Sequence, residues 1–559
     1  MDALNHTIIS WTLLLPLLGA LGIVLAPSER VVRWLAAIAT AATFLVSLHL
    51  PFHFDAQQGG MQFIQNLPWI QSLDIHYFVA VDGISLWLVV LTTLLTFFGV
   101  LVSWKAIHYR VKFFYALLLI LETGMLGVFV GLDLMLFYTF WEVALVPMAL
   151  LIGIWGHERR IYAAVKFFLY TLAGSVLMLA SIIWLHTLTG SFNYLEIQRQ
   201  LATGVVRLSP HAEMVLFLGF FLAFAIKVPL FPFHTWLPDA HVEAPTAGSV
   251  LLAGVLLKMG PYGMLRFNLG LFPHASERAA KVVIILALIG IIYGALVAFV
   301  QPNMKKLVAY SSVSHMGFIV LGIFSFTLLG TQGALNQMLN HGISTGGLFI
   351  LVGMLYERRH TFELAEYGGL ATQMPIYAAF FVVIVMSSAG LPMLNGFVGE
   401  FLIMLGAYTA RHAFGAIAAT GVILSAMYLL RMTKATLWGE NSNPANATLA
   451  DADTRERFVL AGIVLLALYM GVQSTVFTHP TEAAATQALA PFNGEENVRL
   501  RAPLADPRVS TPRFGDPAGI AARFPAHPAA SAATFPSPHP DRTLAVVPRA
   551  VPVAAGGSR

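Results

Sequence analysis

Six ionisable side chains lie inside segments that are otherwise apolar, and they are the residues best suited to chemistry. They are Glu142, Lys227, Lys258, His315, His341 and Glu400. A charged group at the depth of a lipid bilayer costs at least about 2.5 to 3.5 kcal/mol, so charges in spanning helices mark transport pathways. Carboxylate, amine and imidazole groups take up and release protons. The set therefore predicts a proton relay.

Lys227 stands where an apolar helix is interrupted, because Pro229 and Pro232 follow it in the segment FAIKVPLFPFHTWLPDAHVE. Interrupted backbone survives at membrane depth only where it is buried in protein or lines a wet cavity. The next stretch, His234–Glu243, carries acidic residues and histidines but no lysine or arginine. We expect this stretch to be a re-entrant half-helix rather than an ordinary loop.

Glu142 lies mid-helix among apolar and aromatic neighbours in FYTFWEVALVPM. A cation such as Lys227 would let this carboxylate keep its charge. Pairing across helices would also make the protonation state of both groups switchable, since Lys227 can lose its proton when it is parted from Glu142. The alternative is a static buried ion pair.

The other four candidates extend this set through later helices. Lys258 stands close to mid-membrane and is a plausible second station, while His315 and His341 fall among Ser, Asn and Gln residues that can hold water. Glu400 follows a second interruption, SSAGLPMLNGFVGEF, and could pass a proton outward or to a neighbouring subunit. Packing roles for the histidines and a structural role for Glu400 are the alternatives. Lesser candidates are Glu122, a peripheral buried acid, and Asp133, Lys305 and Lys306, expected at helix ends.

The composition indicates a membrane protein that crosses the bilayer many times. Hydrophobic residues make up 57% of the 559 residues and charged residues only 11%. Apolar runs of about 20 residues are long enough to cross a hydrocarbon core of roughly 30 Å. We predict an all-α fold with about fourteen spanning helices, at 7–26, 31–49, 83–103, 113–131, 134–155, 161–188, 211–231, 247–268, 280–300, 305–328, 332–356, 375–408, 413–437 and 457–477.

Basic residues fall in alternate loops, which predicts the orientation of the chain. The loops at 30–33, 105–112, 159–160, 305–306 and 358–359 carry them. By the positive-inside rule these loops are cytoplasmic and both termini face the periplasm. The loop pattern and the absence of a targeting peptide suit a bacterial inner membrane.

Two helix breaks, one in each half of the chain, suggest an inverted repeat with its site at the membrane midplane. The membrane domain is predicted to cover residues 1–480. From 481 to 559 the sequence is rich in Pro, Ala and Arg, which predicts a disordered tail.

Cysteine is absent, and no strand–turn–helix pattern for nucleotide binding is present. The chain is therefore expected to hold no iron–sulfur cluster, flavin, NADH or metal. The net charge of +4 is spread over short loops, which argues against a nucleic-acid partner.

The motifs FWEVALVPM, KVPLFPFHTWLPDAHVEAPTAGSVLLAGVLLKMGPYG, YSSVSHMGF, NHGISTGGLF and GLPMLNGFVGEF resemble the antiporter-like subunits of respiratory complex I, specifically the M subunit type (chain 4). The resemblance covers about residues 1–480. The long tail departs from it, because subunits of this kind end soon after the last helix. Glu400 is similar to the M type, whereas L and N relatives have lysine there.

The resemblance implies two inverted five-helix repeats, each with a broken helix, in the membrane arm of a proton-pumping NADH:quinone oxidoreductase. Glu142 and Lys227 look like the pair of the first half-channel, and Lys258 like the link to the centre. His315 and His341 look like the bridge to Glu400, the terminal group. NADH, FMN, iron–sulfur clusters and quinone are then expected in partner subunits, among them L and N type neighbours and small K, J, A and H type subunits.

Two other functions are open at this stage. A multisubunit cation/proton antiporter of the Mrp type looks like the same fold and shares Glu142 and Lys227. A structural membrane-arm spacer would use the same charges only to hold helices together.

Overall fold

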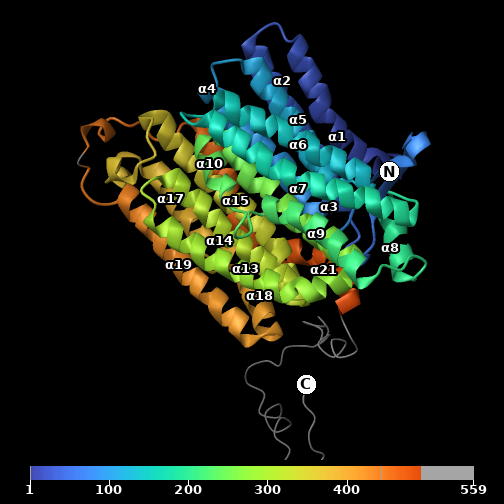
Figure 1. The fold of residues 1–559 in the computed structure, drawn as a ribbon. Helices are drawn as coiled ribbons and strands as arrows, with labels where there is room; N and C mark the ends of the chain where they lie inside the picture. Colours follow the sequence, from blue (N-terminus) through green and yellow to red (C-terminus); the bar gives the residue numbers. More distant parts are fainter. Residues whose placement is uncertain (1, 442, 493–559) are drawn as a thin grey trace, which may run out of the picture. The chain divides into compact units, whose positions relative to one another are not determined.

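The computed structural model describes residues 2–441 and 443–492, and the long helices of this part lie side by side (Figure 1). Twelve helices of this part are long and apolar enough to cross a membrane. They are α1 (Asp2–Leu25), α2 (Glu29–Ser47), α4 (Leu86–Ala106), α5 (Val111–Val130), α6 (Leu134–Trp155), α7 (Arg160–Thr189), α9 (Pro210–Lys227), a composite helix (Thr246–Leu269), α13 (Pro273–Val300), α14 (Met304–Phe324), α15 (Leu328–Arg359) and α19 (His412–Leu437). A thirteenth span exists if α20 (Thr454–Val472) and α21 (Thr475–Leu489), bent by 64°, count as one.

The polytopic all-α class is confirmed, and each of the fourteen predicted spans coincides with a helix or a broken helix. The span predicted at 375–408 is two shorter helices, α17 (Pro375–Ser388) and α18 (Asn395–Ala410), with a break over 389–394. The span predicted at 211–231 ends earlier, at Lys227, and α10 (Trp236–Glu243) follows its break. The inverted repeat stays a prediction.

A β-hairpin between α2 and α4 was not predicted. Strands β1 (Gln62–Ile70) and β2 (Ile75–Val81) pair antiparallel, with Leu67 opposite Tyr77. The hairpin is tied to the helices by Ser10, which donates to Gln65 Oε1 at 2.6 Å, and by the His76 N–H, which donates to Asp133 at 3.0 Å. Short α3 (His49–His53), α8 (Tyr194–Ala202) and α16 (Leu370–Gln373) also lie in connections between spans.

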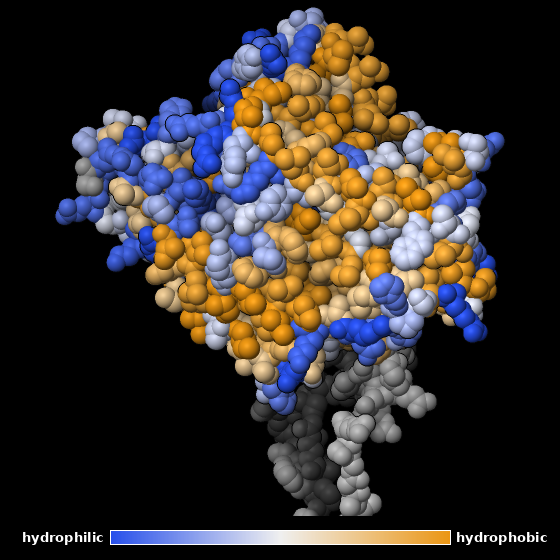
Figure 2. Space-filling model, viewed as in Figure 1, coloured by the Kyte–Doolittle hydropathy of each residue, from blue (hydrophilic) through white to orange (hydrophobic). Residues whose placement is uncertain are grey.

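The helices sort into a buried centre and an apolar outer layer. α15 and the composite helix are buried along their whole apolar stretch, and α14 is buried along nearly all of its apolar stretch. α1, α2, α7 and α19 instead expose apolar side chains such as Leu21, Trp34, Ile161 and Ile423. Figure 2 shows hydrophobic side chains across the visible face, with hydrophilic ones gathered toward its ends. This distribution fits a bilayer around the outer layer and places the polar residues of α14 and α15 away from lipid.

The predicted boundary between membrane domain and tail was placed too early. α21 continues to Leu489 and a short 3₁₀ turn, η6, covers Ala490–Phe492. Pro480 lies inside α21 and does not end it, since Phe477, Thr481, Ala484 and Leu489 pack into the protein. The rest of the predicted tail, 493–559, lies outside the described residues.

Candidate functional site: a buried line of ionisable side chains

The break after α9 places Lys227 at the last helical residue. Pro229 and Pro232 lack the backbone N–H that would continue the helix, so the chain turns before α10 begins at Trp236. The indole N–H of Trp236 donates to the Ile226 carbonyl at 2.9 Å, so this carbonyl has a hydrogen bond although the helix has ended. The predicted half-helix at His234–Glu243 is therefore present as α10, although it begins two residues later.

Lys227 is 1% exposed, and its amine has no hydrogen-bond partner among the described residues. The Nζ atom lies 5.3 Å from the ring centroid of Trp141 and 5.5 Å from that of Phe167. The negative faces of aromatic rings attract a cation, so this cage tolerates the charged amine without fixing it.

Glu142 on α6 interacts electrostatically with Lys227 but makes no ion pair with it within 4.0 Å in the described part of the chain. Its Oε1 atom is buried without a hydrogen bond. Glu142 and Lys227, the predicted pair, thus lie close enough to interact electrostatically but are parted, since they form no ion pair. The two side chains therefore do not form the static ion pair that the sequence left as the alternative.

Lys258 lies in an unusual helix. The composite helix consists of α11 (Thr246–Leu251), the π-helical η2 (Leu252–Leu256), α12 (Leu257–Gly263) and the π-helical η3 (Met264–Leu269). The Lys258 amine donates to the carbonyl of Ala253 within η2. π-helical turns are rare and are frequently found at functional sites, and here two of them flank the buried lysine.

Lys258, His341 and His315 form a continuous contact line through the buried centre. The Lys258 Nζ atom is hydrogen-bonded to His341 Nδ1 at 2.7 Å. His341 Nε2 is buried without a hydrogen-bond partner among the described residues. The ring centroids of His341 and His315 are 5.6 Å apart. In space the order of the two histidines is therefore the reverse of their order in the sequence.

Glu400 closes the line on α18. His315 Nδ1 donates to Glu400 Oε1 at 2.7 Å, and Gln337 Nε2 donates to the same atom at 3.0 Å. Glu400 Oε2 is buried without a partner. One oxygen of the carboxylate is thus held by α14 and α15, and the other is free to take a proton.

The second helix break lets α18 approach α15 closely. A Cβ at Gly399 would lie 2.5 Å from Gln337 Oε1 of α15. At Gly396 a Cβ would instead lie 2.0 Å from the Ser387 carbonyl oxygen at the end of α17. Asn395 spans the break, accepting from Ser387 Oγ at 2.5 Å and donating to the Asn340 carbonyl at 3.3 Å. Gly399 thus permits the contact of α18 with Gln337, a partner of Glu400, and Gly396 permits the tight break between α17 and α18.

The structure brings together Lys258, His341, His315 and Glu400 by direct contacts, and it places Glu142 next to Lys227. Among the described residues no hydrogen bond or ion pair joins Lys227 to Lys258, although α9 and α12 pack tightly. At Gly260, for instance, a Cβ would lie 2.8 Å from the Phe224 carbonyl oxygen. A proton could therefore pass between the two lysines only through water or after a movement of the side chains.

Sequence reasoning missed several polar partners of the line. Gln337, Asn340, His341 and Ser344 follow helical spacing on one face of α15, and this spacing could have been used. Tyr428, whose hydroxyl is 3.4 Å from His315 Nε2, carries no such signal. Two ion pairs were also missed, Lys166–Asp239 at 2.7 Å and the buried Arg266–Asp82 at 2.6 Å.

The lesser candidates are mostly helix-end residues, as expected. Asp133 caps α6 and accepts from the N–H groups of Met135 and Leu136, and burial raises the pKa of its carboxyl. Lys305 and Lys306 lie in the first turn of α14. Glu122 is not peripheral, since it is fully buried in α5 and neither carboxylate oxygen has a hydrogen bond. No cluster of three metal-ligating side chains occurs in the part of the chain that the structure describes.

Comparison with known proteins finds the same architecture and sequence pattern elsewhere. The family described as NADH:quinone oxidoreductase/Mrp antiporter, TM, matches residues 131–427. NADH-quinone oxidoreductase subunit M of Rhodobacter capsulatus is 46% identical over 469 residues, which cover 81% of this chain and 89% of that protein. The subunit M of Rickettsia prowazekii is 43% identical over 474 residues, 84% of this chain and 96% of that protein.

Two solved structures share the fold. A chain of respiratory complex I from Thermus thermophilus with bound NADH superposes with a TM-score of 0.80 at 34% identity, covering 87% of this chain and 100% of that chain. A chain of the Mrp complex from a Dietzia species superposes with a TM-score of 0.77 at 20% identity, covering 87% and 98%. The second likeness concerns the fold alone.

Proposed function

The chain belongs to the NADH:quinone oxidoreductase/Mrp antiporter transmembrane family, and we propose that it is the M-type membrane-arm subunit of a proton-translocating NADH:quinone oxidoreductase. The observation that carries the proposal is the buried line Lys258–His341–His315–Glu400, with Lys227 and Glu142 beside it. Such a line conducts protons but has no group that transfers electrons. Redox energy must therefore come from partner subunits.

In this proposal NADH, FMN, iron–sulfur clusters and quinone belong to those partners. L and N type subunits are the antiporter-like neighbours, with small K, J, A and H type subunits completing the membrane arm. The chain lies in a bacterial inner membrane with the basic loops in the cytoplasm and both termini in the periplasm.

The proposed cycle uses the parted arrangement of Glu142 and Lys227. In this cycle Glu142 and Lys227 are paired in one state and parted in another, and the structure has the parted state. Charge movement in neighbouring subunits separates the pair, and the Lys227 proton then passes by water toward Lys258. From there it follows His341 and His315 to Glu400, whose free oxygen releases it. Moving one proton against about 150 mV requires roughly 3.5 kcal/mol, a sum that changes in burial and charge pairing can supply.

The Mrp-type antiporter remains the second candidate because the fold likeness extends to an Mrp complex. The two functions differ in their energy source. An antiporter would give a sodium-dependent pH change in vesicles without respiratory substrate, whereas the oxidoreductase subunit would pump only while NADH is oxidised.

The test is NADH-driven acidification of inverted membrane vesicles that carry Lys258→Met. Methionine keeps the length and apolar stem of the side chain but carries no proton. We expect pumping to fall about tenfold or more in an assembled complex. Lys281→Ala, at an exposed lysine of α13, is the control. Normal pumping by Lys258→Met, or sodium-dependent exchange without NADH, would contradict the proposal.

A further inference from the structure

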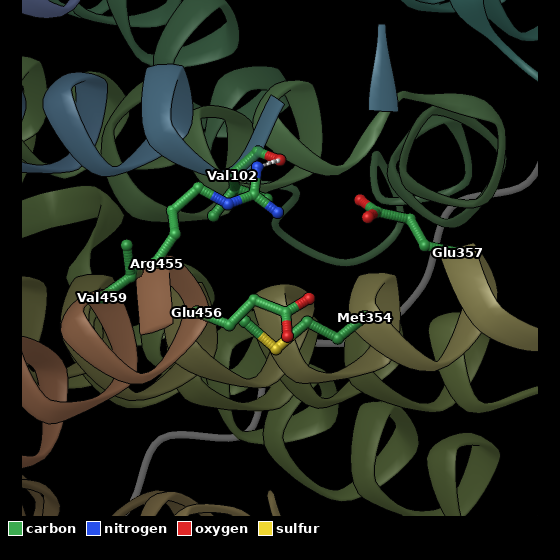
Figure 3. A pocket seen from close by; sticks show the side chains of 6 residues that line it. All are labelled: Val102, Met354, Glu357, Arg455, Glu456 and Val459. Atoms are coloured by element: carbon green, nitrogen blue, oxygen red, sulfur yellow. Dashed lines mark hydrogen bonds between the residues drawn. The ribbon is translucent and has the colours of Figure 1, made fainter. Parts of the chain in front are cut away.

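A cavity of about 580 Å³ opens at the end of the molecule that carries the basic loops. Its wall includes Lys105, His157, Thr246, Tyr356, Phe362 and Arg455. A small pocket adjoins it, because Glu357, Arg455 and Glu456 line both. Figure 3 shows Glu357 and Arg455 extending into the same space from different helices. The charged wall makes the cavity wet, so protons from solvent reach its inner surface.

His157 lies at that inner surface, in the loop between α6 and α7. Its Nδ1 atom is 3.1 Å from the Tyr356 hydroxyl, and its ring packs against Phe362 with centroids 5.4 Å apart. The backbone N–H of His157 donates to the Glu243 carbonyl at the end of α10, at 3.2 Å. Burial, followed by the nearby Lys305 charge, lowers the pKa of His157 to about 4, so its imidazole is neutral at pH 7 and holds an added proton only briefly.

Lys305 stands behind Phe362 and contacts the carbonyls on either side of Glu243. It is 3% exposed, and its amine donates to the carbonyls of Val242 at 3.2 Å and Ala244 at 2.6 Å. Its Nζ atom lies 5.0 Å from the Phe362 ring centroid. A lysine at a helix C-terminus has an ordinary stabilising role. That role does not account for the second titratable group, His157, which lines the cavity and bonds to the Glu243 carbonyl between the two carbonyls that Lys305 holds.

His241 continues the same direction toward the buried line. It lies in α10 one residue before Val242, is fully buried, and neither ring nitrogen has a hydrogen-bond partner. It interacts electrostatically with both Lys305 and Lys258, and also with His341. A buried imidazole without partners is uncommon, since buried polar groups are nearly always satisfied by protein or ordered water. Water between these groups would satisfy it and join the two lysines.

We propose that this cavity is the mouth through which cytoplasmic protons reach the buried line, with His157 and Lys305 as its first stations and His241 as the link to Lys258. The inference rests on the proposed proton-translocating function. His157 accepts a proton from cavity water on one ring nitrogen and returns to its neutral form by giving one up toward Lys305. No bond other than those to the moving proton forms or breaks.

The test compares His157→Gln with His108→Gln and Lys258→Met in NADH-driven vesicles, with pumping expressed per assembled complex. Glutamine can keep the hydrogen bond to Tyr356 but does not relay a proton at neutral pH. His108 lines the same cavity, and among the described residues no hydrogen bond or ring contact joins it to Phe362 or Lys305, so its variant should pump normally. We expect His157→Gln to pump about tenfold more slowly or worse.

A second variant separates a relay from a packing role. His157→Ala leaves room at an open cavity, so added imidazole should restore a substantial part of the pumping lost in this variant and none in Lys258→Met. Pumping by His157→Gln at the rate of the unchanged protein would overturn the inference, as would a His157→Ala defect that imidazole leaves unchanged. If Lys258→Met also pumped normally, the proposed function itself would fail, which distinguishes the two failures.

Discussion

The Lys258 amine lies 2.7 Å from His341 Nδ1, and this contact joins the π-helical region of the composite helix to the centre of α15. Both residues are buried, so a proton on either one can reach solvent only through other buried groups or enclosed water. Since His341 Nε2 has no partner, the imidazole can pass a proton from one nitrogen to the other side.

His341→Gln is expected to slow pumping about tenfold or more while the complex still assembles, because glutamine can bond to Lys258 but cannot relay a proton. Proton uptake and NADH oxidation in the same vesicles measure this. His412→Gln, at an exposed position that begins α19, is the matched control. Equal rates of proton uptake in His341→Gln and the control would show that His341 is not part of the proton path.

Glu400 allows a chemical and a structural effect to be told apart. Glu400→Gln keeps an oxygen for His315 and Gln337 but cannot be ionised, so pumping should fall with little loss of stability. Glu400→Ala removes the acceptor of both donors, and leaving buried donors unsatisfied should cost about 1 to 3 kcal/mol for each. Thermal unfolding of the purified complex beside pumping checks both. If Glu400→Ala were as stable as Glu400→Gln, the hydrogen bonds from His315 and Gln337 to Glu400 would be contradicted.

The buried pair Arg266–Asp82 should serve stability and not transport. Asp82 bonds to Arg266 at 2.6 Å, and both side chains are almost fully buried between α4 and η3. Asp82→Ala leaves a buried charge unpaired and should cost roughly 3 to 5 kcal/mol, which lowers the amount of assembled complex. Arg199→Ala, at an exposed ion pair with Glu196, should leave that amount unchanged. Normal assembly of Asp82→Ala would be the contrary result.

His157 predicts a pH effect on stability. Its pKa is about 4 in the folded protein and about 6.5 in an unfolded chain, so the unfolded chain binds the extra proton as pH falls through this window. Folding stability is therefore lost between about pH 6.5 and 4. The unfolding temperature of His157→Gln should drop less between pH 7.5 and 5 than that of the unchanged complex. Equal drops would mean that His157 is solvated as in the unfolded chain.

Features encoded by local chemistry could be predicted from the sequence. The end of α9 at Lys227 follows from the missing N–H groups of Pro229 and Pro232, and the spans follow from their apolar length. The contact of His315 with Glu400 joins residues 85 positions apart, and no local pattern reports how α14 and α18 approach each other. The continuation of α21 past Pro480 was missed because packing of its apolar face outweighs a weak helical pattern.

The hairpin β1–β2 was missed for a related reason. Pro68 lies within β1, and β1 is mostly exposed, so neither an alternating nor a continuous apolar pattern marked it as a strand. Its order comes from contacts with α1 and Asp133, which lie far away in the sequence. The same holds for Lys305, a helix-end residue, and His157, a loop residue, which both contact the Phe362 ring in the folded chain.

In the proposed function, Lys227, parted from Glu142 in its aromatic cage, moves protons that NADH oxidation drives. This role is tested most directly by the number of protons pumped per NADH oxidised in vesicles with Lys227→Ala, alongside a native gel that shows the complex assembled. Our account predicts that this ratio falls sharply and that oxidation slows, while Lys281→Ala keeps both. An intact Lys227→Ala complex with an unchanged ratio would contradict it.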